Sequence, residues 1–156
     1  MTRLSDGDEA PAFELQDADG KVWRLKDLKG RRIVLYFYPA DDTPGCTVQA
    51  CDFRDSIDEW SKAGYVVLGV SPQGADSKRA FINKYALNFP LLVDEGAEVT
   101  RRYGAYKERG DWEGIPLVVD RSTFVIDEEG VIEHALYGVQ ARGHRDMLKQ
   151  LLQVGS

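Results

Sequence analysis

The chain has 156 residues, of which 43% are hydrophobic and 29% are charged, and its net charge at pH 7 is −6. This length and composition predict a single globular domain over residues 1–156 with one sizeable core. The lysines and arginines are scattered, which argues against a nucleic-acid-binding surface, and no apolar run reaches the length of a membrane span. The amino terminus lacks the apolar segment of a secretory signal, so we expect a cytoplasmic protein.

The amino-terminal half predicts a β-hairpin followed by a strand, a helix and a second strand. Two short alternating runs within residues 13–25 flank an Asp-Ala-Asp-Gly turn, as in a hairpin. Residues 31–39 and 64–72 are nearly continuous apolar runs, typical of buried strands, and Pro39 ends the first of them. Residues 44–62 between them predict a helix. A strand, a helix and a strand in this order favour a right-handed crossover in a parallel sheet.

The carboxyl-terminal half mixes helices and strands and closes with a hairpin and a helix. The predicted segments are a helix over 75–87, a strand over 90–94, a short helix over 97–106, a hairpin over 122–138 and a helix over 143–155. In the last helix, Met147, Leu148, Leu151 and Leu152 fall on one face, which is typical of a helix packed against a core. This mixture of elements predicts an α/β or α+β sandwich.

Both cysteines of the chain lie in the helix predicted over residues 44–62. With Thr43 as the N-cap and Pro44 as the first helical residue, Cys46 is the third and belongs to the first turn. Cys51 is roughly 140° away from Cys46 around the helix axis, off the middle of the inward face. The apolar residues that share this face with Cys46 are Ala50, Phe53, Ile57 and Trp60.

The place of Cys46 in the helix favours a reactive thiol. Free backbone N–H groups and the positive end of the helix dipole stabilise an anion in the first turn, and a thiolate is a nucleophile. The alternative is that Cys46 is a small buried apolar residue, as many cysteines are. The helix separates the Cα atoms of Cys46 and Cys51 by roughly 8.7 Å, whereas a disulfide needs less than about 7 Å. The two thiols therefore join only if the helix unwinds, or they never join.

The residues around the thiols resemble those of a known family. Pro39, Thr43 and Cys46 match the P-x-x-x-T-x-x-C motif of peroxiredoxins, and the string YPADDTPGCTVQACDFRD resembles the Q-type subfamily, also called bacterioferritin comigratory proteins. In that subfamily a second cysteine commonly follows five residues after the first, where this chain has Cys51. The string RSTFVIDEEG resembles the later block of the family, whose arginine corresponds to Arg121. The strings GDEAPAFEL, VVLGVSPQ and FPLLVDE also fit, so the resemblance covers nearly the whole chain.

This resemblance implies an α/β thioredoxin-like fold, in which helices flank a central mixed β-sheet with an N-terminal β-hairpin extension. It also implies a thiol-dependent peroxidase that reduces hydrogen peroxide and organic hydroperoxides in antioxidant defence and redox homeostasis. In such an enzyme Cys46 is peroxidatic and becomes a sulfenic acid, and Cys51 resolves it as an intramolecular disulfide. Thr43 and Arg121 contact the thiolate and the peroxide, and Pro39 shields the pocket. We expect the Thr43 hydroxyl to accept an N–H at the helix start and to donate toward sulfur or peroxide.

The resemblance further implies that thioredoxin, or a similar dithiol, is the reductant and that no cofactor is needed. An intrachain resolving cysteine removes the need for a second subunit, which favours a monomer. His134 and His144 match no zinc-binding spacing, so we expect no metal. The Asp41–Asp42 pair is typical of a solvated loop. We expect neither a nucleic acid nor a membrane as a partner.

Two other classes of function stay open on the sequence. A disulfide exchanger or a redox-responsive binding protein can use the same fold, although the cysteine spacing and the Thr43 motif disfavour it. Rapid, stoichiometric consumption of peroxide would distinguish the enzyme from this class. A non-catalytic interaction domain is the other class, and a Cys46 that is unreactive at neutral pH would indicate it. The fold does not separate these classes, because one fold hosts many functions.

Overall fold

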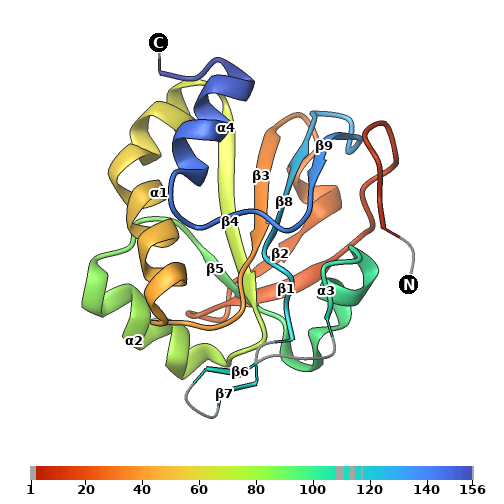
Figure 1. Cartoon of the computed structure of the whole chain (residues 1–156). Coiled ribbons are helices and arrows are strands. Elements are labelled where there is room, and N and C mark those ends of the chain that lie inside the picture. Colours follow the sequence, from red (N-terminus) through yellow and green to blue (C-terminus); the bar gives the residue numbers. More distant parts are fainter. Residues whose placement is uncertain (1–2, 108–110, 113–114, 117, 156) are drawn as a thin grey trace.

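The computed structural model describes residues 3–107, 111–112, 115–116 and 118–155 (Figure 1). In chain order the elements are β1 (Glu14–Asp17), β2 (Val22–Arg24), the 3-10 helix η1 (Leu25–Leu28), β3 (Arg32–Phe37), α1 (Pro44–Lys62), β4 (Tyr65–Ser71), α2 (Ala75–Tyr85), β5 (Leu91–Val93), the 3-10 helix η2 (Glu95–Ala97), α3 (Glu98–Arg102), β6 (Asp111–Trp112), β7 (Ile115–Pro116), β8 (Ser122–Ile126), β9 (Ile132–Leu136) and α4 (His144–Leu152). The predicted elements occur in the predicted order, and α1 has the predicted bounds.

Seven strands form one mixed sheet in the order β2-β1-β5-β4-β3-β8-β9. The inner strands β3, β4 and β5 run parallel, because α1 and α2 are the crossovers that connect them. The other neighbours pair antiparallel: the hairpin β1–β2 joins the sheet at β5, and the hairpin β8–β9 joins it at β3. The predicted mixed sheet with an N-terminal hairpin is confirmed, and the hairpin extends the sheet itself. β6 and β7 form a separate antiparallel pair.

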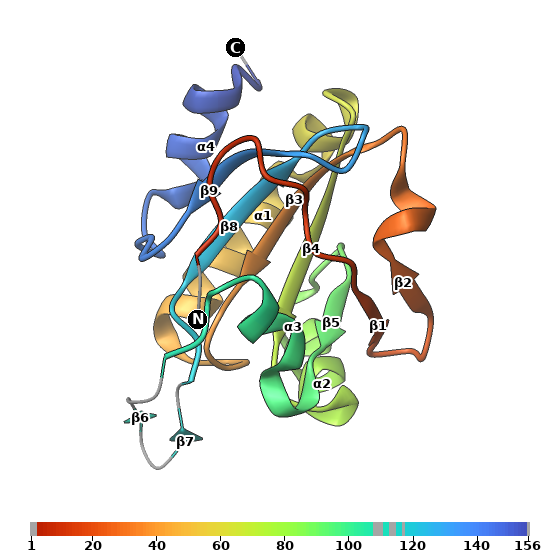
Figure 2. The same ribbon diagram turned by 90° about the vertical axis from the view of Figure 1, so that its right-hand side faces the viewer.

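Helices cover both faces of the seven-stranded sheet. α1, α2 and α4 pack on one face, and α3 lies on the other (Figures 1 and 2). Side chains of β3 alternate between the two layers: Val34 and Tyr36 belong to the core beneath α1, whereas Ile33 and Leu35 belong to the core on the opposite face. β3 therefore lies between both cores, and the loop at its end leads directly into the helix that carries the thiols.

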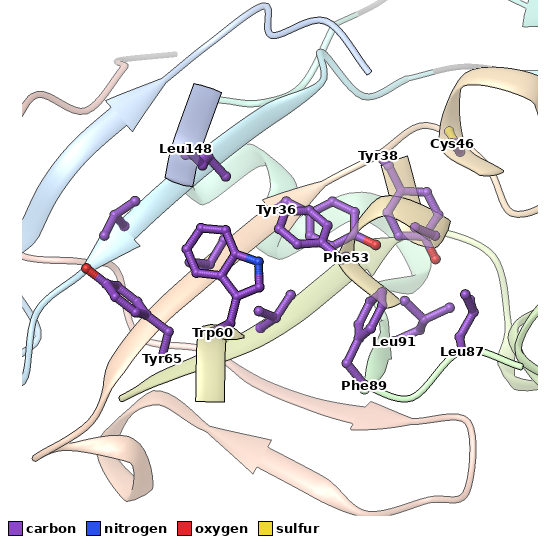
Figure 3. Packing of buried hydrophobic residues seen from close by; sticks show 14 of the residues in the cluster. Tyr36, Tyr38, Cys46, Phe53, Trp60, Tyr65, Leu87, Phe89, Leu91 and Leu148 are labelled. Atoms are coloured by element: carbon purple, nitrogen blue, oxygen red, sulfur yellow. The ribbon is translucent and has the colours of Figure 1, made fainter. Parts of the chain in front are cut away.

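Aromatic rings fill much of the core between the sheet and α1 (Figure 3). The ring of Tyr36 stacks on that of Phe53 with centroids 5.0 Å apart, and the centroid of Phe53 is 6.1 Å from that of Trp60. Gly69 on β4 makes room for Tyr36, since a Cβ atom there would lie 2.9 Å from its hydroxyl oxygen. Cys46 lies at the edge of this cluster (Figure 3). The packing of these rings thus fixes where α1 holds its thiol.

Two helices differ from their predicted form. α2 ends at Tyr85, two residues earlier than predicted, because Ala86 adopts the left-handed conformation (φ 52°). In α4 the predicted apolar face is only partly buried: Leu148 is fully buried, whereas Met147 and Leu151 are 40% and 42% exposed. The reason is that α4 meets the core through His144, Leu148 and Leu152, which are four residues apart and share one face. Met147 and Leu151 each precede one of these residues and are therefore turned about 100° away from that face.

His144 begins α4 and lies on the same face, where it joins this helix to the sheet. Its Nε2 atom is 2.7 Å from the Thr123 hydroxyl oxygen, and its ring meets that of Phe53 edge to face. Burial lowers the pKa of His144 to about 4, and the positive charge of Arg121 adds to this effect. The imidazole is therefore neutral in the folded protein at pH 7.

We expect His144 to make the stability of the fold depend on pH. Because its pKa falls from 6.5 to about 4 on folding, the unfolded chain is the first to take up a proton as the pH drops. The contribution of His144 to the free energy of unfolding is therefore fully present above pH 6.5 and falls by on the order of 3 kcal/mol as the pH drops toward 4. In chemical denaturation at pH 7 and pH 4, His144→Gln should lose less free energy of unfolding than the wild type. His134→Gln is the matched control, because His134 is 30% exposed, and it should behave as the wild type does. Equal losses in the wild type and His144→Gln would contradict this expectation.

Candidate active site

The end of β3 and the start of α1 place the Cys46 thiol at the edge of the core. The chain turns at Pro39, and Thr43 is the N-cap residue in an extended conformation (φ −87°, ψ 157°). Pro44 is the first residue of α1, so Cys46 is the third, as predicted, and it is 2% exposed. The inward face predicted for α1 is confirmed. Its fully buried apolar residues beyond the first turn are Ala50, Phe53 and Trp60.

Arg121 reaches the thiol from the position just before β8, the strand next to β3. Its Nη2 atom donates to Cys46 Sγ at 3.3 Å. β8 pairs with β3 so that Ser122 lies opposite Phe37, which places Arg121 where the chain leaves β3 toward α1. Gly45 permits the approach, because a Cβ atom at that position would lie 3.2 Å from Arg121 Nη2. The structure thus brings together two predicted site residues that are 75 positions apart in the sequence.

Gln49 is a site residue that the sequence analysis did not single out. Its Oε1 atom accepts a hydrogen bond from Arg121 Nη1 at 2.6 Å, and its side chain is buried one turn after Cys46. Two nitrogens of the guanidinium are therefore fixed, one on the amide and one on sulfur. Because the amide is neutral, it leaves the positive charge of Arg121 to act on the sulfur. The i, i+3 spacing between Cys46 and Gln49 is the sequence signal that would have indicated it.

The Thr43 hydroxyl is oriented differently from the prediction. It donates to the Ala40 carbonyl at 2.8 Å, and no helix N–H among the described residues bonds to it. The turn between Pro39 and Thr43 brings the carbonyl three residues back within reach of the hydroxyl. With its proton used in this way, the hydroxyl can accept a hydrogen bond from a ligand but cannot donate to sulfur. Pro39 itself is buried, as a residue that walls the site would be.

Cys51 lies on the same helix as Cys46 but off its inward face, as predicted. It is half-buried, and both thiols are free. Burial raises the pKa of Cys51, although the positive charge of Arg54 opposes the shift. α1 is unbroken across both cysteines. Their Cα atoms are therefore roughly 8.7 Å apart, and no disulfide can join them in this state.

The prediction of a solvated loop is wrong for Asp41. Its side chain is 2% exposed and accepts a hydrogen bond from Ser77 Oγ at 2.7 Å and another from the Nζ atom of Lys78, which is itself fully buried. Asp42 is exposed, as predicted, and pairs with Lys84 at 2.9 Å. The buried ammonium of Lys78 on α2 offsets the cost of removing the Asp41 carboxylate from water.

The described part of the chain holds neither a candidate metal centre nor a helix that could span a membrane. It contains no group of three or more His, Cys, Asp or Glu side chains that could hold a metal ion. The two histidines lie apart in different contacts, with His144 on Thr123 and His134 3.9 Å from Asp6. Across the same residues, no helix combines the length and apolar character needed to cross a bilayer.

Comparison with known proteins assigns these features to a family. The profile of the AhpC/TSA family matches residues 7–135. A putative peroxiredoxin of Mycobacterium tuberculosis is 48% identical over 153 residues, which cover 98% of both chains. The crystal structure of the peroxidoxin BcpB of M. tuberculosis matches with a TM-score of 0.85, at 31% identity over 97% of both chains. The bacterioferritin comigratory protein of Xanthomonas campestris, solved in a study of its alkyl peroxide reduction activity, matches with a TM-score of 0.83, at 33% identity over 90% of both chains.

The chain therefore belongs to the AhpC/TSA family, and its sheet and flanking helices form the thioredoxin-like α/β fold of these relatives. It is an oxidoreductase of the thiol peroxidase class. Within the family it is a peroxiredoxin of the bacterioferritin comigratory type, which confirms the resemblance seen around Cys46 in the sequence.

Arg121→Lys tests the contact between the guanidinium and sulfur. A lysine has one ammonium group, which cannot contact Gln49 and Cys46 as two guanidinium nitrogens do. We expect the second-order rate constant with hydrogen peroxide to fall about 10- to 100-fold, since the loss of one preorganised donor typically costs about that much or more. Arg145→Lys is the matched control, because Arg145 also donates to α1, through the Asp52 carbonyl at 3.4 Å. Equal rate constants in the two variants would contradict a role for Arg121 at the sulfur.

Proposed function

We propose that this peroxiredoxin works with two cysteines: Cys46 reduces the peroxide, and Cys51 resolves the product as an intramolecular disulfide. A dithiol reductant such as thioredoxin then restores both thiols. The observation that carries this proposal is the 3.3 Å contact between Arg121 Nη2 and Cys46 Sγ in the first turn of α1. A positive charge near a helix N-terminus is a setting that favours a thiolate, which is the nucleophile.

The first step is attack of the Cys46 thiolate on one oxygen of a hydroperoxide. A bond forms between sulfur and that oxygen while the O–O bond breaks, and the other oxygen leaves with a proton as water or an alcohol. Sulfur is oxidised by two electrons to the sulfenic acid, and the peroxide is reduced by the same two electrons. The Arg121 guanidinium assists because it stabilises the negative charge that develops on the leaving oxygen.

Thr43 and Pro39 complete the pocket. Because the Thr43 hydroxyl donates its proton to the Ala40 carbonyl, its lone pairs are free to accept a hydrogen bond from the O–H group of a bound peroxide. An acceptor at Thr43 and a donor at Arg121 would together orient the O–O bond toward sulfur. Pro39 is buried and has no N–H group, so it offers the peroxide an apolar wall.

Resolution requires the start of α1 to unwind. The Cys51 thiol attacks the sulfenic sulfur of Cys46, so that an S–S bond forms, the S–O bond breaks and water leaves. The first turns are suited to opening because Gly45 weakens a helix. The later part of α1 is held from outside: Asn88 donates to the Arg54 carbonyl at 3.2 Å. We therefore expect the opening to stop shortly after Cys51.

The substrate and the reductant follow from this cycle. Hydrogen peroxide and organic hydroperoxides both supply the O–O bond, and the alkyl peroxide reduction activity named for the Xanthomonas campestris relative supports the organic substrates. The disulfide freed by unwinding is open to a thiolate of thioredoxin or a similar dithiol. Such dithiols are kept reduced in the cytoplasm, which is the compartment we propose. A monomer is sufficient, because both cysteines belong to one chain.

Stopped-flow tryptophan fluorescence tests the order of these steps. Trp60 is fully buried on α1, and its ring packs against that of Phe53, which lies just after Cys51, so opening of the first turns should change the emission of Trp60. After the reduced protein is mixed with hydrogen peroxide, we expect a fast phase that depends on peroxide concentration and a slower phase that does not. The fast phase should persist in Cys51→Ser and vanish in Cys46→Ser. The slower phase should need both thiols.

Peroxide consumption in the same samples distinguishes a silent fluorescence signal from an inactive protein. Cys51→Ser should complete one turnover and then be recycled poorly by a dithiol. Normal steady-state turnover of Cys51→Ser with thioredoxin would move the resolving role to another group. A wild-type protein that consumes no peroxide would refute the proposed function as a whole.

A further inference from the structure

A buried ion pair lies beneath the loop that leads from β3 into α1. It joins Lys78 on α2 to Asp41 in that loop, with side chains that are 0% and 2% exposed and with Nζ and Oδ2 3.5 Å apart. Lysine is almost never fully buried, because removing its ammonium from water is costly even when a carboxylate is near. The two-cysteine cycle does not use this pair, so its retention in the interior points to another role.

The ammonium of Lys78 is held by groups from several elements. It donates to Ser71 Oγ at the end of β4, at 2.5 Å, and to the Gln73 carbonyl at 3.0 Å. The negative charge of Asp94, which follows β5, also acts on it. Burial lowers the pKa of Lys78 to about 8, while Asp41 and Asp94 oppose this shift. The ammonium is therefore the main form below pH 8.

The Asp41 carboxylate also accepts hydrogen bonds from two hydroxyl groups, one on each side of the loop. Ser77 on α2 donates to Oδ2 at 2.7 Å, and the Tyr38 hydroxyl donates to Oδ1. Tyr38 also faces Lys78: the Nζ atom of Lys78 lies 5.6 Å from the centroid of the Tyr38 ring. The pair and its donors thus tie the loop after β3 to the adjacent helix α2.

The same network fixes the loop backbone next to the thiol. Gln73 accepts a hydrogen bond from the Asp41 N–H at 3.1 Å and donates to the Pro39 carbonyl at 3.0 Å. Ala40 lies between these two anchored residues, and its carbonyl is the acceptor for the Thr43 hydroxyl. The direction of the Thr43 lone pairs therefore depends on a loop that the buried ion pair holds.

We propose, as an extension of the two-cysteine cycle, that Lys78 is a positioning residue that acts through Asp41 on the loop presenting Thr43 and the first turn of α1. With the ion pair intact, the loop keeps the geometry in which Cys46 meets the peroxide. Without it the loop relaxes, so attack slows and the turns that carry Cys46 open more readily. The rate constants for attack and for disulfide formation should then change in opposite directions.

Stopped-flow kinetics of Lys78→Met with hydrogen peroxide measures both rate constants. Methionine keeps much of the length and apolar stem of lysine but has no charge and no donor. We expect attack to slow about tenfold and disulfide formation to accelerate severalfold, because a charge-assisted hydrogen bond in a buried site is worth about one factor of ten or more. The deficit in attack should shrink as the pH rises through about 8, where wild-type Lys78 loses its own charge.

Lys84→Met is the matched control. Lys84 lies on the same helix and pairs with Asp42, the next residue of the same loop, but its side chain is 59% exposed. Exposed pairs contribute little, so both rate constants should stay within about twofold of the wild type. Unchanged rate constants in Lys78→Met, or a decrease in both, would overturn this inference and leave the two-cysteine cycle intact. A wild type that shows neither phase and consumes no peroxide would refute the cycle instead.

A second variant keeps the test decisive if Lys78→Met does not fold. An Asp41 carboxylate left buried without its cation is strongly destabilising, whereas a pair removed as a whole is often tolerated. The double variant Asp41→Asn with Lys78→Met removes both charges and should therefore fold. It should show the same opposite changes, because the link between the loop and Lys78 is absent. Wild-type rate constants in the double variant would show that the ion pair has no positioning role.

Discussion

The hydrogen bond between the Arg121 guanidinium and the Cys46 sulfur is the interaction around which the site is arranged. It joins the start of β8 to the first turn of α1, and these two segments meet because β8 pairs with β3. Gln49 occupies the other side of the guanidinium, so the position of the positive charge depends on the sheet and on the helix together. A shift of α1 against the sheet would alter this contact, so its geometry depends on the aromatic packing beneath α1.

Local sequence patterns predicted the part of the site that one helix contains. Thr43 and Pro44 mark the start of α1, and helical periodicity placed Cys46 on the inward face and Cys51 off it, as observed. Arg121 could not be found in this way. It is 75 positions from Cys46, and its approach depends on the register between two strands, so only the family resemblance indicated it.

Polar residues in the interior were the part that sequence patterns missed. Asp41 resembles a loop residue because acidic pairs usually face water, yet its burial is made possible by a cation from a helix that follows much later in the chain. Gln49 was missed because the inward face of α1 was identified by its apolar residues alone. The exposure of Leu151 beside the buried Leu148 has a related cause: periodicity gives the relative directions of side chains, but the crossing of α4 over its neighbours decides which direction is buried.

The outward position of Met147 has a consequence for a protein that handles oxidants. The chain has two methionines, Met1 and Met147, and Met147 is 40% exposed on α4. Oxidation converts a methionine thioether into a polar sulfoxide, a change that disrupts a packed core. On the outer side of α4 the added oxygen is hydrated, and the next residue, Leu148, which fills the core, has no sulfur to oxidise. Oxidation of Met147 therefore changes only the surface of α4 and leaves the packing beneath α1 and α4 intact.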